Sequence, residues 1–120
     1  MSQFLRVMGR TVPAVRMTQR SKYKSKQAQR YLDYKQTVGW VAKSEKIRQL
    51  KTDVEVTAKA HLHVGSRDMD VDNIAKTVLD SLNGIAWIDD RQVVTLTVSK
   101  VFVHKDFNEL LEIEIKEVSA

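Results

Sequence analysis

The 120-residue sequence has no cysteine, one proline and no long apolar run, and these absences narrow the protein classes it can represent. Without cysteine there is neither a disulfide framework nor a thiolate metal site. No stretch approaches the ~20 apolar residues of a membrane-spanning helix, and the first ten residues lack the apolar centre of a signal peptide. Nucleotide-binding loops and serine nucleophile elbows are also missing. We therefore expect a single cytoplasmic domain over residues 1–120, with no membrane association and no nucleotide cofactor.

Charge is unevenly distributed along the chain. The net charge is +5, but residues 1–60 hold 14 lysines and arginines against four acidic residues, whereas residues 61–120 hold six against eleven. A strongly basic half supplies sequence-independent affinity for a polyanion such as nucleic acid. The alternative interpretation is that these charged faces are simply solvated.

Acidic residues are concentrated between Asp68 and Gln92, a stretch that holds six of the fifteen in the chain. Asp70 and Asp72 are separated by one residue, so their side chains point the same way in an extended segment. Carboxylates about 4 Å apart repel by roughly 1 kcal/mol in bulk water and by more inside a protein. A fold that gathers several of them needs a cation or raised carboxyl pKa values. This stretch is therefore the candidate cation site.

A helix is predicted directly after the two aspartates. Apolar residues recur at helical spacing over about residues 73–83, with Asp72 or Asn73 as the expected N-cap. Lys76 lies four residues after Asp72, so its ammonium is expected to reach back toward the carboxylates. Beyond the helix, Asp89–Asp90 form a second acidic point before a strand that starts near Gln92.

Together these residues form the pattern D-x-D-N-x-x-K-x-x-x-D followed by D-D-x-Q-V. In this sequence the pattern consists of Asp70, Asp72, Asn73, Lys76, Asp80, Asp89, Asp90, Gln92 and Val93. The order, the spacing and the chain length resemble the RusA family of Holliday-junction resolvases. The similarity covers the second half of the chain well and the first half loosely.

The resemblance implies an endodeoxyribonuclease that resolves Holliday junctions by paired symmetric cleavage in DNA recombination and repair. It assigns metal binding to Asp70, Asp72 and Asp90, with Mg²⁺ as the cofactor and Mn²⁺ as a substitute. Lys76 falls on the family lysine, to which we assign stabilisation of phosphate charge. A role in supporting these groups, or a purely structural one, is open for Asp80, Asp89 and Asn73.

The substrate implied is four-way-junction or branched DNA. Because such a junction is two-fold symmetric and needs two opposed cuts, a C2 homodimer is expected. The basic segment of residues 16–23 resembles the N-terminal loop of phage-type relatives and is suited to contact the DNA backbone. The residues predicted to bind DNA are Arg16, Arg20, Lys22, Lys24, Lys26 and Arg67.

The expected fold class is α+β, with a single mixed sheet of about four strands, two helices packed on it and the order β-α-β-α-β-β. Strands are predicted over residues 3–8, 53–64, 93–103 and 110–118, and helices over about 25–51 and 73–83. Residues 53–64 alternate most clearly, with Val64 placed on the apolar face and His61 and His63 on the other. The last two strands, joined by a turn at 104–108, are expected to pair as an antiparallel hairpin.

Two other functions stay open from the sequence. One is a branched-DNA or flap nuclease of broader specificity that uses the same site. The other is a non-catalytic basic DNA-binding module whose acidic residues are structural. An EF-hand is excluded, because the sixth and twelfth positions of that loop are Asn73 and Leu79 instead of glycine and glutamate. For His61 and His63 a solvated strand face is favoured over a metal pair.

Overall fold

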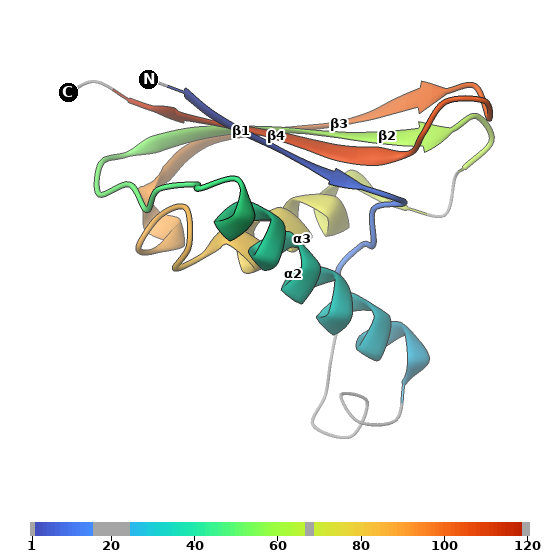
Figure 1. The fold of residues 1–120 in the computed structure, drawn as a ribbon, viewed down its shortest axis with the longest axis horizontal. Coiled ribbons are helices and arrows are strands. Elements are labelled where there is room, and N and C mark those ends of the chain that lie inside the picture. Colours follow the sequence, from blue (N-terminus) through green and yellow to red (C-terminus); the bar gives the residue numbers. More distant parts are fainter. Residues whose placement is uncertain (1, 16–24, 67–68, 119–120) are drawn as a thin grey trace.

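A computed structural model describes residues 2–15, 25–66 and 69–118 of the chain. The element order is β1 (Ser2–Met8), α2 (Lys26–Ser44), β2 (Val54–His63), α3 (Val71–Leu82), a short 3₁₀ helix η1 (Asp90–Gln92), β3 (Val93–Val103) and β4 (Leu110–Glu117). The four strands form one mixed sheet in the order β1-β4-β2-β3. Both helices cover the same face of this sheet (Figure 1). The predicted fold class and element order are confirmed.

The predicted hairpin of the last two strands is wrong. β4 lies between β1 and β2 and is antiparallel to both, whereas β3 pairs only with the other edge of β2, in parallel. A parallel pair needs a crossover, and α3 supplies it between β2 and β3. After β3 the chain therefore crosses over β2, and the short turn at 104–108 joins strands that are not neighbours.

The buried face of the sheet follows from alternation along β2 and β4. Val54, Val56, Ala58, Ala60 and Leu62 are fully buried, and so are alternate residues of β4. Each strand therefore has one apolar face under the helices and one face open to solvent. The alternation ends at His63, and Val64 is 71% exposed, contrary to its predicted place in the core.

Helix α2 begins as predicted but ends earlier. Ser25 is its N-cap, and the Ser25 hydroxyl accepts a hydrogen bond from the Ala28 amide at 3.2 Å. The helix ends at Ser44 and not near residue 51, because Lys46 adopts a positive φ of 59° that turns the chain out of the helix. Gly39 is buried within α2, where a Cβ atom would lie 3.2 Å from Ile85 Cδ1, so the glycine permits close packing.

Helix α3 begins two residues before its predicted start. Its N-cap is Asp70, not Asp72 or Asn73, and the Asp70 side chain makes no capping hydrogen bond. Ile74, Val78 and Leu82 are fully buried against the sheet, as the helical spacing predicted.

Candidate active site

Asp70 and Asp72 lie together in the first turn of α3. Both side chains are exposed. The Asp70 backbone carbonyl accepts hydrogen bonds from the amides of Asn73 and Ile74, each at 3.2 Å, and this holds the turn in place. Asp72 Oδ1 accepts from the Asn73 amide at 3.0 Å. The aligned amides of a helix N-terminus favour negative charge, so the fold tolerates two carboxylates here.

Lys76 follows one turn later on the exposed side of α3. Across residues 2–15, 25–66 and 69–118 its ammonium makes no ion pair, so the predicted contact with Asp72 is not formed and Lys76 does not pair with Asp80 either. Asp80 instead accepts a 2.7 Å hydrogen bond from the Tyr31 hydroxyl, which ties α2 to α3. Lys76 is therefore left available to an external anion.

Asp90 is the first residue of η1 and is partly buried. Its Oδ1 accepts a 2.8 Å hydrogen bond from Nε1 of the fully buried Trp87. Asp89 caps η1, and the hydrogen bond from the Arg91 side chain to its carboxylate lowers the Asp89 pKa. The Asp89 side chain thus has a structural role within the chain.

Both the oxygen and the nitrogen of the Gln92 side chain hold the loop that carries Asp89 and Asp90. Its Oε1 accepts from the amides of Ile88 and Asp89 at 2.8 and 3.0 Å. Its Nε2 donates to the carbonyls of Leu50 and Thr52 at 2.9 and 2.8 Å. The glutamine of the D-D-x-Q pattern therefore positions the loop that carries Asp90.

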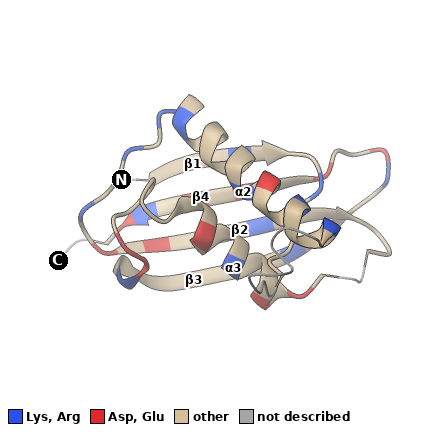
Figure 2. Cartoon of the chain, turned by 90° about the horizontal axis from the view of Figure 1, so that it is seen from below, with Lys and Arg blue, Asp and Glu red and all other residues tan. Residues whose placement is uncertain are grey.

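One chain does not bring Asp90 to Asp70 and Asp72. Helix α3 carries the chain from the end of β2 back to the start of β3, and its 12 residues span ~18 Å. Asp90 lies at the start of β3, whereas the carbonyl of Met69 accepts a 2.9 Å hydrogen bond from Lys100, well along β3. Accordingly, the described part of the chain holds no group of three acidic or histidine side chains able to bind a metal. Figure 2 shows acidic residues spread along α3 and the loop beyond it.

Most of the predicted DNA-binding residues fall outside the described residues: Arg16, Arg20, Lys22, Lys24 and Arg67. Lys26 is described, and it is the exposed first residue of α2. Their role in DNA binding stays a prediction.

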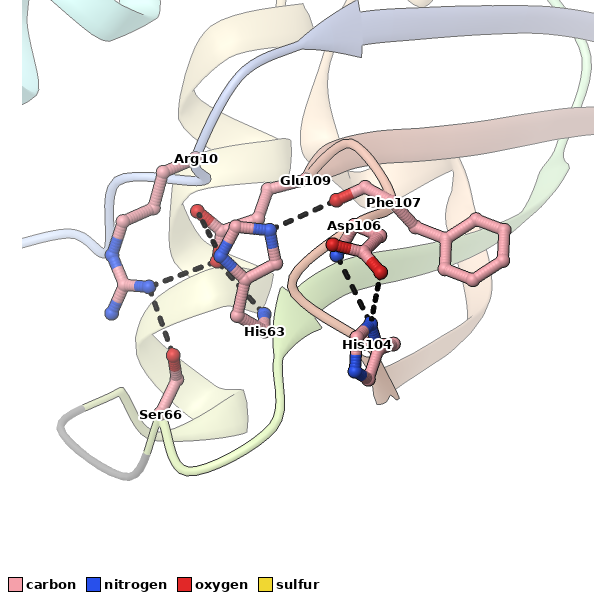
Figure 3. A network of polar contacts seen from close by, with 7 residues as sticks. All are labelled: Arg10, His63, Ser66, His104, Asp106, Phe107 and Glu109. Carbon is pink, nitrogen blue, oxygen red and sulfur yellow. Dashed lines mark hydrogen bonds and ion pairs between the residues drawn. The ribbon is translucent and has the colours of Figure 1, made fainter.

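The two histidines of β2 contact glutamates on the open side of the sheet. His61 Nε2 lies 3.3 Å from Glu112 Oε1, and this contact is the main cause of a lowered Glu112 pKa. His63 contacts Glu109, which also binds Arg10 at 3.1 Å (Figure 3). These partners come from β4 and from the residues before it, so the histidine face is less solvated than expected.

Sequence reasoning missed a cavity of about 500 Å³ beside the start of α3. Its lining includes Gln27 and Arg30 from α2 together with residues 10–15. No linear pattern signals it, because the lining comes from segments far apart in the chain.

Comparison with known proteins identifies the family of the chain. The family model described as endodeoxyribonuclease RusA matches residues 6–116. A Bacillus subtilis (strain 168) protein, the uncharacterized protein YqaN, is 47% identical over 51 residues, which are 42% of this chain and 34% of that protein. The matched region is thus about a third of the length of that relative. None of the helices in the described ranges is long and apolar enough to cross a membrane.

Proposed function

The chain belongs to the RusA endodeoxyribonuclease family, and we propose that it is a Mg²⁺-dependent, structure-selective nuclease that resolves four-way DNA junctions by paired cuts. The observation that carries the proposal is the exposed pair Asp70 and Asp72 at the start of α3, with the unpaired Lys76 one turn later. Two carboxylates can hold a cation, and a nearby lysine can stabilise charge on a phosphate, so this helix end is suited to cleave a phosphodiester.

The donor set fits Mg²⁺, which binds proteins through one or two carboxylates and otherwise keeps its waters or takes phosphate oxygens. Asp70 and Asp72 would hold the ion, and Mn²⁺ would serve as a substitute. When bound, the ion polarises the phosphate and lowers the pKa of a water. Among the described residues, the Asp70 side chain makes no hydrogen bond, and the Asp72 carboxylate accepts one only through Oδ1. Both residues therefore have oxygens available.

Lys76 would stabilise the negative charge that develops on the phosphate during cleavage. Its ammonium is exposed and has no competing carboxylate partner among the described residues. A charge that is already unpaired needs no rearrangement to meet the transition state.

The distance between Asp90 and the other two aspartates supports a homodimer. If Asp90 also contacts the metal, it must come from a second chain, because α3 separates the two groups within one chain. A C2 dimer makes the same contact twice. It therefore creates two equivalent sites, as two opposed cuts in a two-fold symmetric junction require.

Mixed dimers test this arrangement. Asp70→Asn and Asp90→Asn chains, each inactive alone, are co-expressed with different tags and purified as the heterodimer. If each site takes Asp70 from one chain and Asp90 from the other, one of the two sites is intact and the heterodimer nicks the junction. Failure to nick, with a wild-type dimer that cuts, would contradict a shared site.

A non-catalytic DNA-binding module is the second candidate, since the described part of one chain holds no cluster of three metal-binding side chains. A labelled four-way junction, a flap and a linear duplex, each with and without Mg²⁺, separate the candidates. A resolvase cuts the junction in paired positions, and a broader branched-DNA nuclease also cuts the flap. A binding module shifts the DNA in a gel and cuts nothing.

A further inference from the structure

The cavity beside the first turn of α3 has the composition of a nucleobase pocket. Its floor includes Thr11, Ala14 and Met69, which are 1%, 4% and 3% exposed. Polar side chains of Gln27 and Arg30 from α2 complete the lining, with Asn73 from α3. A volume of about 500 Å³ lies within the range of small-molecule sites.

The cavity wall is fixed against the helix that carries the two aspartates. The Ala14 amide donates to the Asn73 carbonyl at 3.1 Å, and the Thr77 hydroxyl donates to the Val12 carbonyl at 2.9 Å. The segment after β1 therefore cannot move away from α3 without losing both bonds. Figure 1 shows this segment passing beside both helices.

The cavity is lined by the two residues that flank the carboxylate pair in the sequence. Met69 directly precedes Asp70, and Asn73 directly follows Asp72, and both Met69 and Asn73 line the cavity. The cavity is therefore close in the fold to the helix end at which the proposed cation would hold a phosphate.

Polar groups of the lining have unused hydrogen-bonding capacity. Within the described ranges, the side chains of Gln27, Arg30 and Asn73 make no hydrogen bond or ion pair. The buried Thr11 hydroxyl makes no hydrogen bond of normal geometry with the described residues, although it lies near the Tyr34 hydroxyl. Guanidinium and amide groups read base edges, and enzymes that extrude a base hold it between apolar walls. A phosphate alone would not need the apolar floor.

We propose that this cavity receives one nucleobase, displaced from the DNA stack next to the phosphate that lies at the Asp70–Asp72 site. Arg30 and Gln27 contact its edge, and Met69 and Ala14 supply apolar surface. The inference rests on the proposed function and extends it, because it makes the cavity a determinant of where the strand is cut.

The test is carried out without divalent metal, so that it does not depend on cleavage. Junctions carry the fluorescent base 2-aminopurine at successive positions around the branch point, and fluorescence is measured with protein at saturation. Wild-type protein should raise the fluorescence strongly at one position on each of two symmetric strands. Arg30→Ala and Gln27→Ala should remove most of that rise. Arg30→Ala should also weaken binding by ~10-fold more than the control does.

Lys43→Ala is the matched control. It removes one positive charge from the same helix, 13 residues or ~20 Å away from Arg30. Arg30, Gln27 and Lys43 are exposed helix positions, and alanine favours helix, so all three variants should fold.

The outcomes separate the two proposals. If wild-type protein binds junctions and the pocket variants behave like Lys43→Ala, the nucleobase pocket is refuted while the nuclease proposal stands. If wild-type protein does not bind branched DNA at all, both are refuted. A position-specific rise that only the pocket variants abolish supports the pocket.

Discussion

Two tyrosines one turn apart on α2 should respond in opposite directions to loss of their hydroxyl groups. Tyr31 is 1% exposed and Tyr34 is 8% exposed. The Tyr31 hydroxyl donates to Asp80 Oδ2 at 2.7 Å, whereas the buried Tyr34 hydroxyl makes no hydrogen bond of normal geometry with the described residues, although the Thr11 hydroxyl lies near it. Phenylalanine substitution keeps the ring packing in both cases, so each variant isolates one hydroxyl.

The expected magnitudes follow from these environments. A hydrogen bond to a charged group contributes about 1.5–3 kcal/mol. Asp80 is exposed and water can replace its lost donor, so Tyr31→Phe should destabilise by about 1–2 kcal/mol. A buried unsatisfied group costs about 1–3 kcal/mol, so Tyr34→Phe should stabilise by about 1 kcal/mol. For a domain of this size each kcal/mol moves Tm by about 4 °C.

Alkaline pH should enlarge the difference in stability between Tyr34→Phe and wild type. Burial raises the pKa of Tyr34 to about 12, although the nearby Thr11 hydroxyl opposes the shift. The unfolded tyrosine titrates near 10. The fold therefore favours neutral tyrosine, and this contribution is complete below pH 10 and is lost as pH rises toward about 12. Tyr34→Phe removes the loss, so its advantage over wild type should grow through this window.

Urea unfolding followed by circular dichroism at pH 7 and at pH 10.5 measures both effects. The free energy of unfolding of each variant is compared with that of wild type. The comparison is valid if the variants share one slope of free energy against urea concentration. Equal destabilisation by Tyr31→Phe and Tyr34→Phe at pH 7 would refute the reasoning, since it would mean that the Tyr34 hydroxyl is satisfied, for example by a water shared with Thr11.

The remaining predictions concern the candidate site and its support. Lys76→Ala should lower cleavage by ~100-fold or more with Tm unchanged, and near wild-type single-turnover rates would contradict this. DNA affinity should fall with a log–log salt slope of roughly −0.9 per duplex phosphate contacted, and a flat response would exclude the basic half from binding. Gln92→Glu should destabilise by about 2–4 kcal/mol in urea unfolding, because a carboxylate replaces the amide that donates to Leu50 and Thr52. Unchanged stability would show that these bonds contribute nothing.

Periodicity predicted the elements because each buries one face. The alternation of β2 and β4 and the helical spacing of α3 are local patterns, and the structure buries the expected residues. Which strands pair is not a local property, and this explains why the predicted hairpin was wrong. The 104–108 turn is short enough for a hairpin, yet β4 pairs with β2 along eight residues, from Val54↔Glu117 to His61↔Leu110. The strand order places β4 on one edge of β2 and β3 on the other, so both edges of the most buried strand are paired.

Element ends were harder to predict than element centres. Asp72 and Asn73 are good capping residues, but α3 starts at Val71, before either of them. Polar residues continue after Ser44, so no local pattern marks the end of α2, and a single residue with a left-handed backbone, Lys46, turns the chain away there. Such boundaries depend on tertiary contacts, not on local preference.

The candidate site shows why a compact motif need not be a compact site. The D-x-D-N and D-D-x-Q parts are close in sequence, but α3 separates them by its full length. Each part is nevertheless fixed with a carboxylate oxygen available: Trp87 binds only Oδ1 of Asp90, and Asp72 has engaged only one oxygen. The Gln92 side chain makes four hydrogen bonds, and all four hold the Asp90 loop in place. These bonds also serve the fold, because Asp90 satisfies the N–H of the fully buried Trp87 and Gln92 satisfies backbone groups of two other segments. The second oxygen of Asp90 is the group that the proposed site on a second chain would use, so the mixed-dimer experiment, and not the rigidity of the loop, decides between a structural and a metal-binding role.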